Sequence, residues 1–321
     1  MRKYSSYNYI NGNYIVIVSP SGKLTKRAFR AGEELKAAFP DSIDLKISNR
    51  CKIGCPFCHE SSIPGGKIFD FDKTIEILSQ LPKEPIEIAI GGGDVLETPK
   101  ETGRLICWLN EHGYKPRITI NWNSIKDFPE LQSITPVDAL GISIQDLPEL
   151  KKTSWDVEES LAATFDIESG NPSNRLTEEI KIVFHIIAGV FPPDKLEKLF
   201  ETCSYDRTAI LVLGYKRFGR GKHTGPSDEK ILEFEQAVKQ LIYKNRTRFL
   251  NNVIGFDNLA LEQLHIKDSL TNFEWNSLYM GEEGRHSMYI DAVNGEFAKT
   301  SRSEDRVSWD SIGLLDYFKS L

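Results

Sequence analysis

A repeated order of segments, which begins at Ile43, constrains the fold of this 321-residue chain more than any other feature. Each unit is a short strand-like run, then a polar turn, then an amphipathic stretch with helical periodicity. The strand-like runs lie at residues 43–47, 86–90, 118–122, 140–144, 180–187 and 208–213. Strands that alternate with helices form parallel sheets with right-handed crossovers. The sequence therefore predicts an α/β fold, a partial (β/α)6 TIM-like barrel.

Helix-like stretches fill most of the intervals between these strands. They lie around residues 72–81, 101–112, 126–133, 155–165 and 194–202. Gly and Pro are scattered as punctuation, and no repeat or low-complexity linker divides the series. We therefore expect one main domain over residues 43–225.

Two additions flank this domain. In residues 1–42, two β-prone runs flank Pro20-Ser21-Gly22, which is turn chemistry and predicts a hairpin over residues 13–29. In residues 226–321 we expect a helix and a small extension. Its residues 281–298 have the pattern of two strands joined by an Asn-Gly turn.

Composition excludes some function classes. The formal net charge of -6 and the pI near 5.7 argue against a surface built mainly to bind nucleic acid, although a local basic groove remains open. The longest apolar runs are far shorter than the roughly 20 residues that a membrane-spanning helix needs. The first residues lack the apolar core of a signal peptide. We expect a cytoplasmic protein.

Three of the five cysteines cluster in one short segment, Cys51-Lys-Ile-Gly-Cys55-Pro-Phe-Cys58, directly after the first strand of the series. Cys107 and Cys203 stand alone. This clustering predicts a metal site rather than a disulfide framework. Three thiolates on one compact loop suit an iron-sulfur cluster, in which the fourth iron would keep an open position.

A structural zinc site is the main alternative for this segment. Zinc accepts three cysteines and one histidine, and His59 directly follows the last cysteine. Zinc sites usually draw their ligands from two separated segments, whereas here all three cysteines lie on one loop after a strand. We therefore favour the cluster and interpret His59 as a neighbouring or substrate-side group.

The cysteine spacing, with aromatic Phe57 before the last cysteine, resembles the signature of the radical S-adenosylmethionine superfamily. Similarity of order and spacing covers about residues 43–221. The resemblance implies that Cys51, Cys55 and Cys58 hold one four-iron four-sulfur cluster and that Phe57 packs near the adenine of S-adenosylmethionine. It also implies an oxygen-sensitive enzyme that cleaves this cofactor to a 5'-deoxyadenosyl radical, with flavodoxin or ferredoxin as the usual electron donor.

At the end of the second strand, Gly91-Gly92-Gly93-Asp94 resembles the Gly-Gly-Glu type motif of that family. The resemblance implies that these residues bind the amino group of the methionine moiety. Glycines let a backbone approach a ligand closely, and a carboxylate accepts hydrogen bonds from an ammonium group. The motif departs from the family at Asp94, which stands where the family has glutamate.

Polar residues lie on one face of the third and fourth strands. Alternation assigns Thr119, Asn121 and Asn123 to one face of the third strand, and Ser143 with Gln145 to one face of the fourth. The resemblance implies that Ser143 and Gln145 contact the ribose or the carboxylate of S-adenosylmethionine. Ordinary polar filling of the barrel is the alternative.

Two later features are candidates for substrate or cofactor contacts. Alternation places His185 inside the barrel, where a histidine is more often a hydrogen-bonded core residue than a catalyst. The loop after the sixth strand carries Lys216, Arg217 and Arg220 among glycines. It could bind a carboxylate or a phosphate, or it could be a solvated basic loop. The sequence does not single out a catalytic residue.

The strand pair at residues 281–298 resembles the hairpin of the SPASM extension in peptide-modifying radical enzymes. No cysteine follows Cys203, so we expect no auxiliary cluster. The hairpin favours a peptide or protein side chain as substrate, and the basic loop leaves a nucleotide or nucleic-acid base as the alternative. A zinc-stabilised binding module and a plain electron carrier are the non-enzymatic alternatives.

Overall fold

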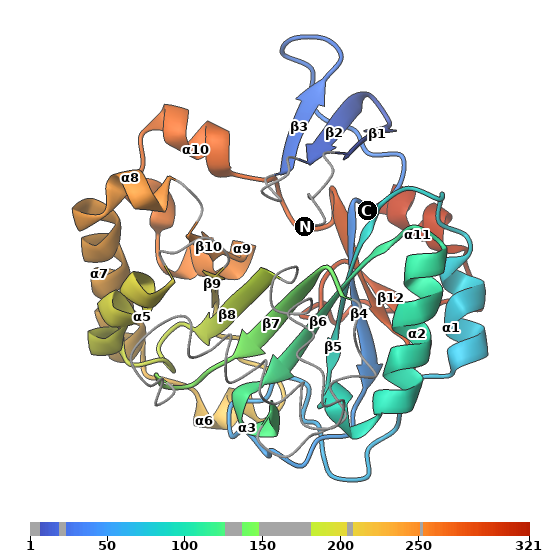
Figure 1. The fold of residues 1–321 in the computed structure, drawn as a ribbon, viewed down its shortest axis with the longest axis horizontal. Coiled ribbons are helices and arrows are strands. Elements are labelled where there is room, and N and C mark those ends of the chain that lie inside the picture. The colour runs from blue at the N-terminus through green and yellow to red at the C-terminus, as the bar shows by residue number, and fades with distance from the viewer. Residues whose placement is uncertain (1–6, 19–23, 126–136, 148–180, 204–207, 251–252) are drawn as a thin grey trace, which may run out of the picture.

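The computed structural model describes residues 7–18, 24–125, 137–147, 181–203, 208–250 and 253–321. Its strands form two sheets, a small three-stranded one and a large one of ten strands (Figure 1). The large sheet has the order β10-β9-β8-β7-β6-β5-β4-β11-β12-β13. The expectation of an α/β fold with a mostly parallel sheet is confirmed.

All six strands predicted from the repeated order are present, and neighbours in sequence are neighbours in the sheet. Each pairs in parallel with the next. Their bounds are β4 Ser42–Ser48, β5 Glu87–Gly92, β6 Lys115–Asn121, β7 Ala139–Ser143, β8 Lys181–Ile187 and β9 Thr208–Leu213.

The large sheet extends beyond these six strands at both edges. Strand β10 (Ile254–Phe256) pairs in parallel with β9, and β11 (Ser287–Asp291) pairs in parallel with β4. Strands β12 (Glu296–Ala298) and β13 (Val307–Ser308) continue from β11 in antiparallel order. The hairpin predicted near the end of the chain is thus present as β11–β12, and it is built into the main sheet beside β4.

Helices cover the outer face of this sheet, with α1 (Phe71–Leu78) and α2 (Pro99–Glu111) near one edge and α5 (Leu196–Thr202) and α7 (Asp228–Lys244) near the other (Figure 1). Helix α1 begins at Asp70, whose side chain accepts a hydrogen bond from the backbone of Lys73. The turn η3 (Pro193–Lys195) leads into α5. Three of the predicted helices are therefore confirmed. Those at 126–133 and 155–165 lie outside the described residues.

Period-two alternation decides which side of each strand packs against the helices. In β8, Ile182, Phe184 and Ile186 are buried against the outer layer, whereas Val183 and His185 lie on the inner face and keep partial access to water. The same alternation runs through β6. The inner face of the sheet is therefore the face available to a bound molecule.

The second half of the chain adds helices around the β9–β10 edge. They are α7 (Asp228–Lys244), α8 (Arg246–Phe249), α9 (Asn258–Gln263), the turn η4 (Ile266–Ser269) and α10 (Asn272–Leu278), with α11 (Leu314–Ser320) near the end of the chain. Helix α10 begins with a capping box between Thr271 and Glu274. In the part of the chain that the structure describes, no helix is long and apolar enough to cross a membrane.

The small sheet consists of β1 (Tyr7–Asn11), β2 (Tyr14–Val18) and β3 (Leu24–Ala28) in antiparallel order. The predicted hairpin is confirmed as β2–β3, and its turn at residues 20–22 lies outside the described residues. The sequence analysis missed β1, which joins β2 through Gly12 at a positive φ of 59°.

A buried carboxylate fixes the small sheet to the large one. Asp41, just before β4, accepts hydrogen bonds from the hydroxyls of Tyr9 and Tyr14 and pairs with Lys26 at 2.8 Å. The Tyr14 hydroxyl also lies 3.0 Å from Nδ1 of His286, which precedes β11. The two sheets and the segment before β11 thus share one polar centre.

Candidate active site

The three clustered cysteines lie on the loop that follows β4. Cys51 is buried, and Cys55 and Cys58 are partly buried. The backbone fixes the loop through hydrogen bonds from Cys51 N to Ile63 O (3.0 Å) and from Cys58 N to Cys55 O (3.2 Å). Burial raises the pKa of Cys55, and the neighbouring thiols of Cys51 and Cys58 raise it further. The three sulfurs therefore lie within electrostatic reach of one another.

The donor set of this loop suits a cluster better than a single ion. Among the described residues, no three His, Cys, Asp or Glu side chains are arranged to hold one metal ion. A zinc site needs four ligands about 2.0–2.3 Å from one ion, but His59 directs its Nε2 to Glu60, 3.4 Å away. In a four-iron cluster each thiolate binds a different iron, so the sulfurs stay further apart. Three cysteines on one loop can supply one thiolate to each of three irons.

Gln145 lies beside the cysteines. It follows β7, 90 residues along the chain, and its Nε2 donates a hydrogen bond to Sγ of Cys55 at 3.4 Å. Ser143, at the end of β7, is in register with Asn121 on β6 and His185 on β8. The structure therefore brings the predicted polar strand ends to the same edge as the cysteine loop. Their contact with S-adenosylmethionine stays a prediction.

The glycines after β5 have a packing role that the sequence analysis did not foresee. A Cβ on Gly93 would lie 2.2 Å from the carbonyl oxygen of Arg50, and one on Gly92 would lie 2.5 Å from that of Ser48. The backbone of Gly93 donates to Ser48 O at 2.6 Å. These glycines let the end of β5 approach the start of the cysteine loop. Gly91, by contrast, faces open space.

Asp94 has partners of its own. One carboxylate oxygen accepts from the backbone of Leu96 at 3.1 Å, so Asp94 caps the turn η1 (Val95–Glu97). The other accepts from the Ser124 hydroxyl at 2.6 Å, where α3 (Trp122–Ile125) follows β6. Burial raises the pKa of Asp94. The predicted contact with an ammonium group stays a prediction, and it would need an acceptor site that these bonds leave open.

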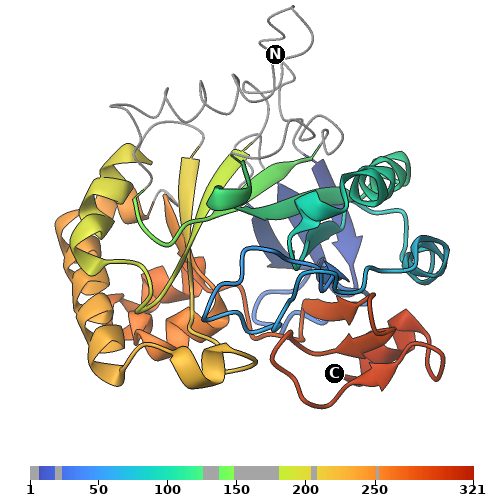
Figure 2. The same cartoon turned by 90° about the horizontal axis from the view of Figure 1, so that it is seen from below.

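The basic loop after β9 packs against the cysteine loop. Arg220 donates from its backbone to Cys58 O (3.0 Å), from Nε to Cys55 O (3.1 Å) and from Nη1 to Ser62 O (2.7 Å). The short helix α6 (Gly221–Thr224) follows, and Thr224 donates to the carbonyl of Pro56 at 2.5 Å. Figure 2 shows this gold segment beside the blue loop after β4.

The other two cations of this loop have partners outside the cysteine loop. Arg217 pairs with exposed Asp228 at 2.7 Å, and Lys216 donates to the Ser301 hydroxyl at 2.8 Å. The sequence suggested either an anion-binding loop or a solvated one. In the structure the guanidinium of Arg220 binds carbonyls of the cysteine loop, and anion binding by the rest of the loop stays a prediction. No local pattern could have predicted the contacts of Arg220, because they join positions more than 150 residues apart.

Two titratable side chains line the inner face of the sheet. Asp44, on β4, keeps access to water. Desolvation by the surrounding protein raises its pKa to about 6, and the positive charge of Lys216 lowers the pKa in part. His185 has its pKa lowered to about 4 by burial, so its ring is neutral at neutral pH. Its ring lies over Gly141, where a Cβ would be 2.6 Å from Cε1.

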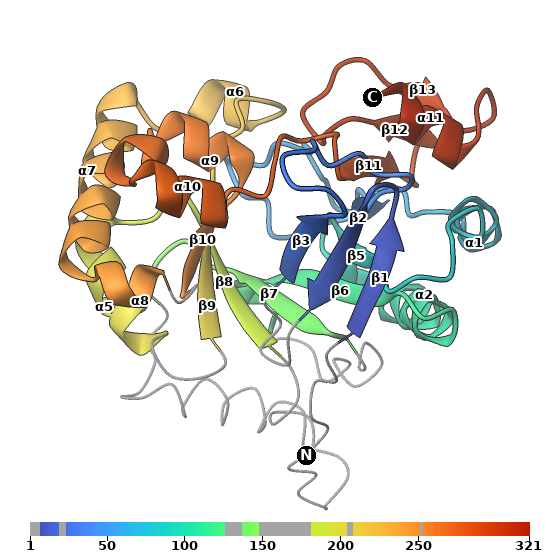
Figure 3. The ribbon, with the colours of Figure 1, turned by 90° about the horizontal axis from the view of Figure 1, so that it is seen from above.

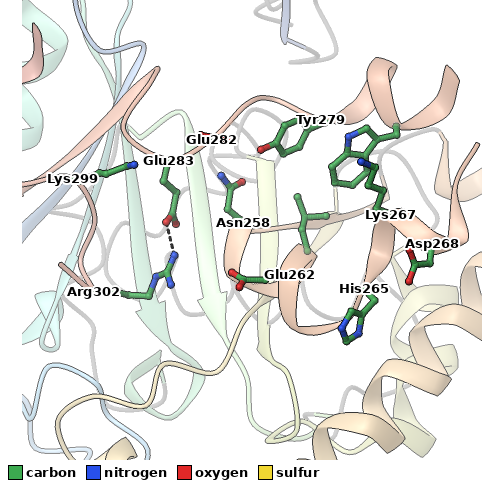
Figure 4. Close-up of a pocket in the computed structure, with 12 residues that line it drawn as sticks. Asn258, Glu262, His265, Lys267, Asp268, Tyr279, Glu282, Glu283, Lys299 and Arg302 are labelled. Carbon is green, nitrogen blue, oxygen red and sulfur yellow. Dashed lines mark hydrogen bonds and ion pairs between the residues drawn. The ribbon is translucent and has the colours of Figure 1, made fainter. Parts of the chain in front are cut away.

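A cavity of about 480 Å³ lies between the helices after β10 and the segments that flank β11–β12 (Figure 4). On one side, the rings of Trp275 and Tyr279 stack with their centroids 4.7 Å apart. On the other side, Nη2 of Arg302 lies 2.5 Å from Oε2 of Glu283. The charge of Glu283 contributes to the raised pKa of Asp44. The cavity could not be predicted from the sequence, because its walls come from separate segments.

Both the sequence and the fold were compared with those of known proteins. No family model and no curated protein matches the sequence. Solved structures do match. SuiB of Streptococcus suis bound to the precursor peptide SuiA aligns with a TM-score of 0.59 over 88% of this chain, at 14% identity. The chain therefore shares the fold of SuiB.

A second structure, SuiB bound to S-adenosylmethionine, aligns with a TM-score of 0.57 and 15% identity, again over 88% of this chain. The alignments cover 65% and 66% of the SuiB chains, so this chain matches just under two thirds of their length. The fold shared with SuiB thus accounts for most of the present chain. It leaves about a third of SuiB without a counterpart in it.

Proposed function

We propose that this protein is a radical S-adenosylmethionine enzyme that holds one four-iron four-sulfur cluster through Cys51, Cys55 and Cys58. The observation that carries the proposal is the position of these thiols. They share one loop at the end of β4, beside Gln145 and the Gly91–Asp94 turn, in a chain with the fold of SuiB. The likeness of fold and the local donor set both support the proposal.

When bound, the cluster supplies one electron to S-adenosylmethionine, whose cleavage gives the 5'-deoxyadenosyl radical that removes hydrogen from a substrate. The residues of this chain would bind and orient the reactants. Gln145 holds the Cys55 sulfur, and we assign Phe57, Ser143 and the Gly91–Asp94 turn to the cofactor. The inner face of the sheet would exclude water from the reaction.

A peptide or protein side chain is the substrate class that we favour. SuiB has been solved with its precursor peptide bound, and in the present chain a cavity of about 480 Å³ lies between the helices after β10 and the segments that flank β11–β12. A cavity of this size suits a few side chains of a polypeptide. We also propose that a flavodoxin-type or ferredoxin-type protein supplies the electron.

The test is anaerobic reconstitution with iron and sulfide, reduction with dithionite, and chromatographic measurement of 5'-deoxyadenosine. We expect the reconstituted chain to form this product. Each of the substitutions Cys51→Ala, Cys55→Ala and Cys58→Ala should abolish it, because the cluster loses one of its three protein ligands.

Cys107→Ala is the matched control, because Cys107 is an exposed cysteine on α2, outside the loop. It should form 5'-deoxyadenosine at the wild-type rate. A protein that stays colourless and takes up one zinc ion would support the zinc-stabilised module instead. A brown protein that never forms 5'-deoxyadenosine would support the electron carrier.

A further inference from the structure

A buried lysine lies between two carboxylates beneath the cysteine loop. Lys46, on β4, is 6% exposed, and its Nζ is 2.7 Å from Glu60 Oε2 and 3.0 Å from Asp291 Oδ2. Asp291 lies on β11, in register with Lys46. Glu60 lies two residues after Cys58. The lysine therefore connects the cysteine loop to a strand near the end of the chain.

Glu60 is held from β11 a second time. Its Oε1 accepts a hydrogen bond from the Tyr289 hydroxyl at 3.2 Å, and His59 Nε2 lies 3.4 Å from the same oxygen. Both oxygens of this carboxylate are therefore engaged. Figure 3 shows α6 and the β11–β13 strands at the same end of the molecule, with the blue loop between them. Arg220 holds the cysteine loop from one side and Glu60 holds it from the other.

The other partners in this network do not depend on Glu60. Asp291 also accepts from the backbone of Val293, from the Asn294 side chain and from Arg306. Lys46 keeps Asp291 as a counter-ion when Glu60 is absent. A buried charge that retains its partner is not left uncompensated. The contribution of Glu60 is therefore specific to the loop on which it lies.

We propose that Glu60 is a positioning residue, which ties the cysteine loop to β11 through Lys46 and Tyr289 so that the cysteines retain the cluster. This inference rests on the proposed function, because it concerns retention of the cluster. Groups that hold metal ligands in place commonly change metal affinity about 10-fold to 100-fold when they are removed.

The test compares wild type with the substitutions Glu60→Ala and Glu60→Gln after anaerobic reconstitution and desalting. Iron release to an excess of the chelator bathophenanthroline disulfonate is followed by absorbance. We expect Glu60→Ala to release iron about 10-fold faster than wild type. Glu60→Gln should fall between them, because its single amide oxygen can replace only one of the two carboxylate oxygens, which accept from Lys46 and from Tyr289.

Glu235→Ala is the matched control. Glu235 is also a buried carboxylate with a lysine partner, Lys239 at 2.6 Å, and it lies on α7 away from the cysteine loop. This variant should release iron at the wild-type rate. Thermal unfolding of the metal-free chains separates loop positioning from general stability, since Glu60→Ala should lower the Tm no more than Glu235→Ala does.

A redox titration adds a readout that a purely structural role would not change. Loss of a negative charge near the cluster should raise the midpoint potential in Glu60→Ala but not in Glu235→Ala. Equal iron release in wild type and Glu60→Ala, or equally fast release in Glu235→Ala, would overturn the inference. A wild-type chain that takes up no cluster would instead overturn the proposed function.

Discussion

Gly93 has no room for a side chain, because a Cβ at this position would lie 2.2 Å from the carbonyl oxygen of Arg50. The obstacle is backbone, which cannot rotate away as a side chain can. The conformation of the cysteine loop and that of the glycine turn are thus set together. At the residue scale, Gly92 and Gly93 are needed for packing whether or not the motif also binds a cofactor.

We predict that Gly93→Ala lowers the free energy of unfolding of the metal-free chain by about 2 kcal/mol, in the range of overpacking substitutions. Urea unfolding followed by circular dichroism measures this change. Gly91→Ala is the matched control, because its Cβ would meet nothing within 4 Å. Equal losses in the two variants would show that the close approach to Arg50 does not matter.

Asp44 makes the stability of the chain depend on pH. Desolvation by the surrounding protein raises its pKa from 3.8 to about 6, so between these values the native state binds more protons than the unfolded state. Below about pH 4 Asp44 is protonated in both states and does not lower the free energy of unfolding. As the pH rises through about 6, Asp44 ionises in the native state, and the free energy of unfolding falls.

Asp44→Asn removes this titration. We expect the variant to be more stable than wild type at about pH 7.5 by about 1 kcal/mol, a discounted value because water reaches the side chain. The advantage should fade towards about pH 4. Chemical unfolding across this range measures the difference, and a difference that is independent of pH would contradict the raised pKa.

At the scale of elements, the segment from β9 to α6 is hydrogen-bonded to the cysteine loop. Arg220 donates to the carbonyls of Cys55, Cys58 and Ser62. The bonds to Cys55 and Ser62 come from the side chain, and the bond to Cys58 comes from the backbone and is kept in an alanine variant. We predict that Arg220→Ala increases the rate of amide exchange at residues 51–63 in the metal-free chain about 10-fold, since two lost hydrogen bonds of about 1 kcal/mol each favour local opening. Hydrogen exchange with mass spectrometry measures the change.

Arg217→Ala provides the comparison for that experiment. Arg217 is on the same loop, but it pairs with an exposed aspartate and makes no contact with the cysteine loop that the structure records. Its removal should leave uptake at residues 51–63 unchanged. If both variants behave alike, the loop is held by something other than Arg220.

The sequence predicted the six strands of the β/α series because each has several apolar residues and a clear turn after it. Strand β10 was not predicted, because its three residues, Ile-Gly-Phe, are too few to show an alternation of apolar and polar side chains. The β11–β12 hairpin was predicted from an Asn-Gly turn, but a turn signal does not specify what pairs with the outer edge of a strand. The parallel pairing of β11 with β4 was therefore out of reach.

The same limit applies to the site. The cysteines and the glycine turn could be predicted because their spacing is local. Gln145 could be predicted as a polar residue at a strand end, but its bond to Cys55 could not. Lys46 and Glu60 gave no signal, because an isolated lysine in a strand and a glutamate in a loop are common. Their partners lie up to 245 residues away.

At the scale of the whole molecule, β4 pairs on one side with β5 and on the other with β11, the strand that comes about 240 residues later. Contacts between positions so far apart slow folding, because a long loop must close before they form. During synthesis, β4 and its cysteines emerge long before their partner strand. Glu60 and Lys46 can contact Tyr289 and Asp291 only once β11 has been made, so under the proposed role of Glu60 stable retention of a cluster begins after translation has passed Asp291.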